Sequence, residues 1–370
     1  MEFPGKYIFH QPFSQSVPSF ANNPYIRILS AYMQKEKFII IGNGPAGFYA
    51  AKKIRAEIPD CSITMFDREP LPFYTKIRLP DLIAGKVEEK KLFLSSLEDY
   101  KKFALDIHLG TEIASVNHKD RNIVTSTGQI FYYDKLVIAT GAKAFRPPTI
   151  KGISHEGVYV LRTISDARKI MEKMRISQNA VVLGGGLLGL ELAQALNAKG
   201  LKVNVIEFFP RLLPKQLNET EAAILLKKLE SPSLSFLLDR ITTEIISQDG
   251  GLLAKTNRGD EIKTDFTIVS AGIKTEINLA EYSGLKTEFG IIVNDRFETS
   301  EKDIYAIGDC AQFDGKTFGL WAAAKEQGEA LAEIFSGKRP SYKPSAFNPI
   351  PKVTGVNLDE IRKEAKQGSA

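Results

Sequence analysis

The feature of this sequence that most constrains its fold is a glycine-rich turn that occurs twice. Residues 42–47 (GNGPAG) follow the apolar run 38–41, and residues 184–189 (GGGLLG) follow the apolar run 180–183. In the pattern G-x-G-x-x-G, the first glycine allows a tight turn and the second lets the backbone approach a diphosphate. The third lets the following helix pack closely on the strand. Each copy therefore predicts a strand, a turn and a helix that together bind a dinucleotide.

An acidic residue ends the next predicted strand in each copy. Asp67 lies 25 positions after Gly42, and Glu207 lies 23 positions after Gly184. At this distance a carboxylate accepts hydrogen bonds from adenosine ribose hydroxyls, while the helix N-terminus holds the diphosphate. One glycine turn could be purely structural, but two complete copies favour the binding of two dinucleotides.

The rest of the sequence fits an α/β fold with two Rossmann-like domains, one inserted into the other. Residues 136–141 and 266–272 each indicate a buried strand that ends in a glycine turn, and 303–309 indicate another. Pro147-Pro148 and the polar segment 263–265 are plausible crossings between the domains. The predicted order is an N-terminal extension (1–36), the first part of the outer domain (37–148), the inserted domain (149–264), the second part of the outer domain (265–340) and a short C-terminal segment (341–370).

Composition excludes several classes of protein. The 370 residues are 43% hydrophobic and 25% charged, as in soluble globular proteins, and no apolar run is long enough to span a bilayer. The net charge of +5 is too small and too evenly spread to indicate nucleic-acid binding. Two cysteines and four scattered histidines give no disulfide framework and no metal site. Prolines interrupt the first 36 residues, which argues against a secretory signal and for a cytoplasmic location.

The order of these motifs resembles the two-dinucleotide flavoprotein reductases of the pyridine nucleotide-disulphide oxidoreductase superfamily. The matching segments are 42–47, 139–141, 184–189 and 305–309, and the resemblance covers about residues 37–335. Residues 71–80 (LPFYTKIRLP) are most similar to NADH:rubredoxin oxidoreductases and to the flavin module of NAD(P)H-dependent nitrite reductases. Ferredoxin reductases of the oxygenase type are the next most similar group.

The resemblance implies that the first glycine turn binds FAD and the second binds NAD(P)H. The implied FAD contacts are Gly42, Gly44, Pro45, Ala46 and Gly47 at the diphosphate, Asp67 or Glu69 at the adenosine ribose, Lys76 and Arg78 along the flavin or its phosphates, Ile113 at the adenine, Ala139, Thr140, Gly141 and Lys143 beside the cofactor, Gly308 and Asp309 at the ribityl chain, and Trp321 and Ala322 near the isoalloxazine ring. A core tryptophan is the alternative for Trp321, and a surface lysine is the alternative for Lys76.

The implied NAD(P)H contacts are Gly184, Gly186, Leu187, Leu188, Gly189, Glu191, Glu207 and Gly272. Glu207 would accept a hydrogen bond from a ribose 2′-hydroxyl and would repel a 2′-phosphate. Because no arginine follows it until Arg211, we expect NADH rather than NADPH. Glu191 would lie near the nicotinamide, with an ordinary helix-surface glutamate as the alternative. Gly272 would let the chain approach the nicotinamide nucleotide closely.

The resemblance also implies the reaction. Hydride transfer requires the nicotinamide close to the flavin, and the cofactors carry the chemistry, so no acid–base pair is needed. Thiol-dependent members of the superfamily carry one or two cysteines in the segment that corresponds to residues 71–84, which here contains none. Cys61 and Cys310 are therefore predicted to be buried structural thiols.

We expect an NADH-dependent FAD reductase that passes electrons to a protein iron centre, such as rubredoxin, ferredoxin or an iron-sulfur subunit. Such carriers are commonly acidic, and the net charge of +5 is compatible with that. The alternatives are an electron-input flavin subunit of a larger complex resembling nitrite reductase, an NADH oxidase, and a nucleotide-responsive binding protein resembling apoptosis-inducing factor.

Both ends of the chain depart from the resemblance. Related reductases continue into a C-terminal interface domain, whereas here residues 351–358 resemble its start and a polar helical tail over 359–370 follows. This leaves the oligomeric state open and suggests an exposed flavin edge that would suit docking of another protein. Residues 1–36, rich in aromatic residues and proline, are expected to form an arm that packs on this protein or a partner, with a disordered tail as the alternative.

Overall fold

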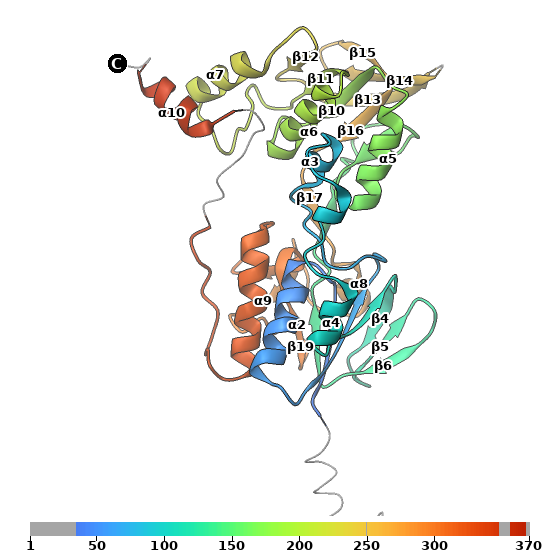
Figure 1. The fold of residues 1–370 in the computed structure, drawn as a ribbon, viewed down its shortest axis with the longest axis vertical. Coiled ribbons are helices and arrows are strands. Elements are labelled where there is room, and N and C mark those ends of the chain that lie inside the picture. The colour runs from blue at the N-terminus through green and yellow to red at the C-terminus, as the bar shows by residue number, and fades with distance from the viewer. Residues whose placement is uncertain (1–34, 249, 348–355, 368–370) are drawn as a thin grey trace, which may run out of the picture.

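The structure is a computed structural model that describes residues 35–248, 250–347 and 356–367. It contains two five-stranded sheets, each in its own lobe (Figure 1). The first sheet has the order β19-β7-β1-β2-β3 and the second the order β12-β11-β10-β16-β9, and all neighbouring strands are parallel. This confirms the predicted α/β class with two Rossmann-like domains.

Continuous apolar runs form the centres of both sheets. The strands of the first sheet are β1 (Lys37–Ile41), β2 (Ser62–Asp67), β3 (Asp106–Leu109), β7 (Lys135–Ile138) and β19 (Ile304–Ala306). Those of the second are β9 (Val158–Val160), β10 (Asn179–Leu183), β11 (Lys202–Ile206), β12 (Leu234–Leu237) and β16 (Phe266–Val269). β1 and β10 are buried at every residue after the first. Parallel sheets covered on both faces require such runs.

A glycine sets the distance between the two helices that cover the first sheet. Helix α2 (Pro45–Glu57) follows β1 and packs along α9 (Trp321–Phe335) (Figure 1). At Gly328 in α9, a Cβ atom would lie 2.4 Å from the carbonyl oxygen of Ala46 and 2.9 Å from the nitrogen of Ala50. The helices can approach this closely only because residue 328 has no side chain.

Smaller elements surround the sheets. The other helices are α3 (Leu79–Ile83), α4 (Leu97–Lys102), α5 (Ile164–Met174), α6 (Leu187–Ala198), α7 (Glu219–Leu229), α8 (Asn278–Tyr282) and α10 (Leu358–Gln367), with 3-10 turns η2 (Glu89–Lys91) and η3 (Gly308–Cys310). Two antiparallel sheets consist of β4 (Ile113–Asn117), β5 (Asn122–Thr125) and β6 (Ile130–Tyr132), and of β13 (Thr242–Gln248), β14 (Gly251–Thr256) and β15 (Glu261–Thr264). Two further strand pairs are β8 (Ala142–Ala144) with β17 (Ile273–Thr275), and β18 (Ile291–Val293) with β20 (Ala311–Phe313).

One predicted domain boundary is wrong. β16, which lies within residues 265–340, was expected in the outer domain, but it pairs with β10 at the centre of the second sheet. All four residues of β16 are buried, so this run fills the core of the inserted domain. The polar segment 263–265 connects β15 to β16 and is not a crossing between domains. The chain returns to the first domain after Val269, where β17 pairs with β8.

Part of the outer domain packs on the inserted domain. Leu79, Leu82 and Ile83 of α3 belong to the same buried cluster as Ile164 of α5 and Leu192 of α6. Figure 1 shows α3 beside α6, far from α2 and α4, which are close to it in sequence. The segment around α3 therefore joins the two domains.

The two ends of the chain differ in how far the described residues extend into them. Residues 1–34 of the expected N-terminal arm lie outside the described residues, as do 351–355 and 368–370. The expected C-terminal helix is present as α10. None of the helices in the described ranges is long and apolar enough to cross a membrane.

The packing at residue 328 predicts the sign of a stability change. Alanine is favoured over glycine in a helix by about 1 kcal/mol where there is room. At this position the added methyl group clashes with the backbone of α2, so we expect Gly328→Ala to lower the free energy of unfolding by about 1–3 kcal/mol. Urea denaturation would measure it. Ala56→Ser, on the exposed side of α2, should change stability by less than about 0.5 kcal/mol. A more stable Gly328→Ala protein would contradict the packing argument.

Candidate dinucleotide-binding site

A cavity of about 830 Å³ lies at the carboxyl ends of the first sheet and extends to the second domain. Residues that follow β1, β2, β7 and β19 line one side, and Leu161–Thr163 and Leu188 of the second domain line the other. Its volume is in the range of sites for large organic ligands. In open parallel sheets, ligands bind at this end of the strands.

Most of the predicted FAD contacts line this cavity. They are Gly42, Gly44, Pro45, Ala46, Asp67, Glu69, Lys76, Ile113, Ala139, Thr140, Gly141, Lys143, Gly308, Asp309 and Trp321, together with Leu188 from the predicted NAD(P)H set. The other predicted contacts, which do not line it, are Gly47, Arg78, Gly184, Gly186, Leu187, Gly189, Glu191, Glu207, Gly272 and Ala322. Arg78 forms an ion pair with Asp81, 3.3 Å away, and Ala322 is exposed.

The three glycines of the first turn have different roles. Gly42 has φ +115°, and a Cβ there would lie 2.1 Å from the carbonyl oxygen of Ala139. A Cβ on Gly47 would lie 2.0 Å from the carbonyl oxygen of Gly42, whereas a Cβ on Gly44 would meet no protein atom within 4 Å. Gly42 and Gly47 are therefore required by the protein, while Gly44 leaves open space at the cavity. Gly44 is also the N-cap of α2 and supplies no capping side chain, so the positive end of the helix dipole can bind an anion.

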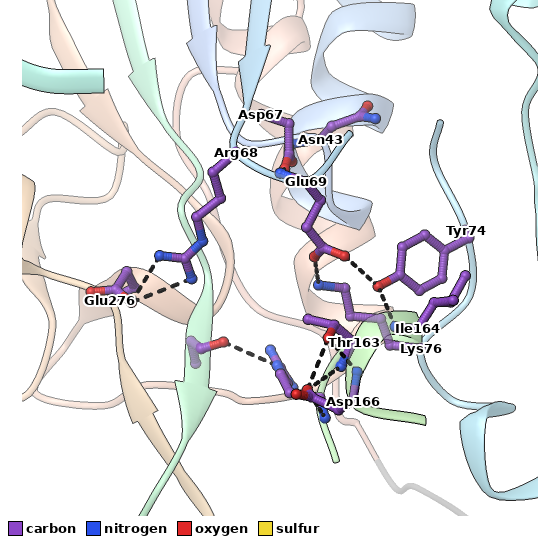
Figure 2. Close-up of polar contacts among 12 residues, drawn as sticks. Asn43, Asp67, Arg68, Glu69, Tyr74, Lys76, Thr163, Ile164, Asp166 and Glu276 are labelled. Atoms are coloured by element: carbon purple, nitrogen blue, oxygen red, sulfur yellow. Dashed lines mark hydrogen bonds and ion pairs between the residues drawn. The ribbon is translucent and has the colours of Figure 1, made fainter. Parts of the chain in front are cut away.

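Asp67 holds the first turn in place. Its carboxylate accepts hydrogen bonds from the backbone N–H groups of Asn43 (2.6 Å) and Glu69 (2.7 Å). Figure 2 shows Asp67 beside Asn43. Burial raises the pKa of Asp67, and these two hydrogen bonds oppose that rise. A carboxylate has about four acceptor positions, so the same group can still accept from ribose hydroxyls.

Glu69 is the centre of a polar cluster at the domain boundary (Figure 2). It accepts hydrogen bonds from the Tyr74 hydroxyl and from Lys76 Nζ, both at 2.6 Å. The Tyr74 oxygen in turn accepts from the backbone N–H of Ile164 at the start of α5 (3.2 Å). Lys76 is thus held at the cavity by an ion pair and is not a freely solvated surface lysine.

Sequence reasoning missed two ion-pair partners in this site. Arg162 donates to Asp309 Oδ2 at 2.9 Å and to the carbonyl of Ala142 at 3.0 Å, and so links the inserted domain to a predicted FAD contact. Glu276 accepts from Arg68 and Lys143, and Figure 2 shows Arg68 reaching it from the end of β2.

A local signal existed for only one of these partners. Thr163 and Asp166 form a capping box that marks the start of α5, and Arg162 directly precedes it. Glu276 lies 133 positions from Lys143 and had no comparable signal.

Trp321 lies between the core and the cavity. It lines the cavity and stacks on Phe73, with ring centroids 5.5 Å apart and an interplanar angle of 17°. Phe73 stacks in turn on Phe48 at 4.4 Å. Trp321 is therefore a partly buried residue that packs against the core and forms a wall of the cavity.

The second glycine turn repeats the geometry of the first. Gly184 has φ +117°, and a Cβ on Gly189 would lie 1.9 Å from the carbonyl oxygen of Gly184. A Cβ on Gly186 would meet no atom within 4 Å, and α6 has no side-chain cap there. Glu207, which is 5% exposed, accepts from the backbone N–H groups of Gly185 and Phe209, as Asp67 does in the first turn.

Glu191 lies outside the large cavity, in a small hollow that Asp81, Lys86 and Gln194 also line. Burial, with a smaller contribution from Asp81, raises the pKa of Glu191 to about 7. It is thus not an ordinary exposed helix glutamate, and its proximity to the nicotinamide stays a prediction. Gly272 has φ +99° and open space where a Cβ would lie.

The two cysteines lie away from the site. Cys61 and Cys310 are both buried, which confirms the prediction for these thiols, and neither lines the cavity. Burial raises the pKa of each thiol, which disfavours the reactive thiolate.

Comparison with known proteins decides the family. The pyridine nucleotide-disulphide oxidoreductase family matches residues 36–328, which include both glycine turns. The chain belongs to this family. As a pyridine nucleotide-disulphide oxidoreductase it uses FAD and NAD(P)H, as the sequence predicted, and the two open glycine turns and the cavity fit these cofactors.

The chain is similar to several proteins of known name. The assimilatory nitrate reductase electron transfer subunit of Bacillus subtilis (strain 168) is 34% identical over 328 residues, which are 88% of this chain and 42% of the relative. NADH-rubredoxin oxidoreductase of Clostridium acetobutylicum is 31% identical over 88% of this chain and 81% of the relative. The solved structure of a NAD-dependent persulfide reductase from A. fulgidus has a TM-score of 0.80 and 31% identity, covering 89% of this chain and 65% of that one. The chain spans about two fifths of the length of the Bacillus relative.

The contrast between Gly44 and Gly47 predicts different effects for similar substitutions. Gly44→Val should leave the melting temperature of the flavin-free protein nearly unchanged but greatly lower the flavin content, because the side chain occupies open space beside the expected diphosphate. Gly47→Ala should destabilise the flavin-free protein, since its methyl group meets the backbone of Gly42. Flavin absorbance per chain and thermal unfolding would distinguish the two. Full flavin content in Gly44→Val would argue against this diphosphate site.

The raised pKa of Glu191 predicts how stability depends on pH. The folded chain keeps this proton up to about pH 7, while the unfolded chain loses it near the ordinary value of 4.5. The contribution of this group to stability is therefore greatest at low pH and is lost as the pH rises through this interval. We expect Glu191→Gln to raise the melting temperature at pH 8 more than at pH 5, whereas the exposed control Glu98→Gln should not. Equal effects at the two pH values would contradict this assignment.

Proposed function

We propose that this chain transfers a hydride from NADH to FAD and then passes electrons to a protein iron centre such as rubredoxin or ferredoxin. The observation that carries the proposal is the shared cavity. Leu188 of the second glycine turn lines the same cavity as the first turn and Trp321. A nucleotide on each turn can therefore extend into one common space, as hydride transfer requires. When bound, the flavin accepts the hydride and releases electrons one at a time.

The residues around the cavity have positioning roles. Gly44 and Gly186 leave room for the two diphosphates, and Arg162 holds Asp309 at the predicted ribityl position. Trp321, backed by Phe73, forms a rigid wall of the cavity. Because no cysteine lines the cavity within the described residues, a thiol relay from the flavin is not part of this proposal.

NADH is the favoured reductant. The buried carboxylate of Glu207 stands at the expected ribose position, where it would repel a 2′-phosphate. The next two side chains, Phe208 and Phe209, are exposed aromatic rings that offer no positive charge. The first arginine after Glu207 is Arg211, whose guanidinium lies 3.8 Å from the exposed carboxylate of Glu219.

The iron-centre acceptor is supported by the name of one relative, NADH-rubredoxin oxidoreductase. The name of the Bacillus relative, an electron transfer subunit, supports the coarser statement that electrons leave the chain for another protein. The same name also supports a second candidate. In that role the chain would be the electron-input part of a larger redox complex. A cytoplasmic location stays a prediction from the sequence.

Anaerobic stopped-flow spectroscopy at the flavin absorbance tests this function. We expect NADH to bleach the flavin at least about tenfold faster than NADPH, because a charge repulsion at the ribose costs more than about 1.4 kcal/mol. Glu207→Gln should narrow this ratio, while the exposed control Glu261→Gln should preserve it. Mixing the reduced protein with rubredoxin, ferredoxin and air then ranks the acceptors. Absence of flavin reduction by either nucleotide would overturn the proposal, and fastest reoxidation by air would favour an NADH oxidase.

A further inference from the structure

Helix α10 lies far from the helix that precedes it. Figure 1 shows it beside α7 at the outer end of the second domain, whereas α9 belongs to the first domain. Leu358, Ile361 and Ala365 are buried, at a spacing that places them on one face of the helix. A helix of ten residues is not stable alone in water, so this packing must hold it in place.

The surface that α10 covers is a leucine cluster. Leu358 and Ile361 share it with Leu225 and Leu229 of α7 and with Leu190 of α6. The cluster continues into the loop between β11 and α7 through Leu212, Leu213 and Leu217. An ion pair between Glu364 and Lys228 (2.9 Å) adds to the contact. We call this group of residues the leucine cluster.

The leucine cluster also supports the second glycine turn from behind. The backbone N–H of Leu213 donates to the carbonyl of Gly185 at 3.1 Å. A side-chain carbon of Leu212 lies 2.8 Å from the position that a Cβ on Gly185 would occupy. Leu213 has φ +47°, a conformation that costs a leucine about 1 kcal/mol or more and must be held by its surroundings.

We propose that α10 positions the second glycine turn through the leucine cluster and so sets the affinity for NADH. Leu358 and Ile361 are positioning residues in this scheme. Their burial keeps Leu212 and Leu213 pressed against Gly185, one residue from the turn's opening at Gly186. The inference rests on the proposed binding of NADH at this turn.

The effect is confined to one of the two nucleotides. The first glycine turn packs in a separate cluster that contains Ala46 and Phe48 and none of the residues around α10. Loosening α10 should therefore weaken NADH binding and leave flavin binding unchanged. If α10 had a purely structural role, loosening it would instead lower the thermal stability and the flavin content together with the affinity for NADH.

Ile361→Ala and Leu358→Ala in the full chain test this inference. The dependence of the flavin reduction rate on NADH concentration gives a Kd and a limiting rate. We expect the Kd to rise roughly 2- to 30-fold, the range for substitutions that act through packed networks, with flavin content and limiting rate unchanged. Lys363→Ala, on the exposed side of α10, is the matched control and should leave the Kd unchanged. If Ile361→Ala does not fold, Ile361→Val provides the milder change.

Deleting residues 356–370 and then adding a peptide of that sequence gives a second measurement. The deletion should raise the Kd for NADH, and the peptide should lower it again. Suppose that NADH reduces the wild-type protein, but that Ile361→Ala and the deletion variant bind NADH with the same Kd as the wild-type protein. This result would overturn the inference about α10 and leave the proposed function intact. Failure of NADH to reduce the wild-type protein would instead count against the proposed function.

Discussion

A carboxylate that accepts hydrogen bonds from the backbone of a glycine turn is the interaction on which both halves of this molecule depend. Asp67 accepts from the amide of Asn43, and Glu207 accepts from the amide of Gly185. Each bond joins the end of the second strand to the turn after the first strand. Because charged hydrogen bonds are stronger than neutral ones, this contact fixes the direction in which the following helix points its N-terminus. We predict that the same carboxylates also accept hydrogen bonds from the nucleotide ribose, so that one group would serve both the fold and recognition.

The contacts between the two domains lie around the cavity. Arg162 reaches Asp309, Tyr74 accepts from the amide of Ile164, and α3 packs on α5 and α6. These contacts fix the distance between the two glycine turns, which hydride transfer between their nucleotides would require. The ion pair between Arg162 and Asp309 and the hydrogen bond between Tyr74 and Ile164 are shielded from solvent at least in part. Water and salt therefore weaken these interactions less than they weaken ion pairs on the surface. The cavity is consequently a property of the domain arrangement and not of either sheet alone.

Much of the site could be predicted, because its residues carry local patterns. Fifteen of the predicted FAD contacts line the cavity, and they follow from glycine turns and strand ends that are readable within a few residues. The prediction was wrong for β16, whose apolar run fits either core and whose partner β10 lies more than eighty positions earlier. It also missed Arg162 and Glu276, since ion pairs across 147 and 133 positions leave no trace in local sequence.

The sequence by itself determined that two strand–turn–helix units exist and that each ends its second strand with an acid. These features follow from steric limits on φ and from the periodicity of apolar residues, which act over short distances. Only the tertiary structure decided which strands share a sheet, that Glu191 lies beside Asp81, and that α10 packs on α7 in a buried cluster that also contains Leu212 and Leu213. Those arrangements depend on which apolar surfaces bury one another, and many pairings of similar runs satisfy the same local pattern.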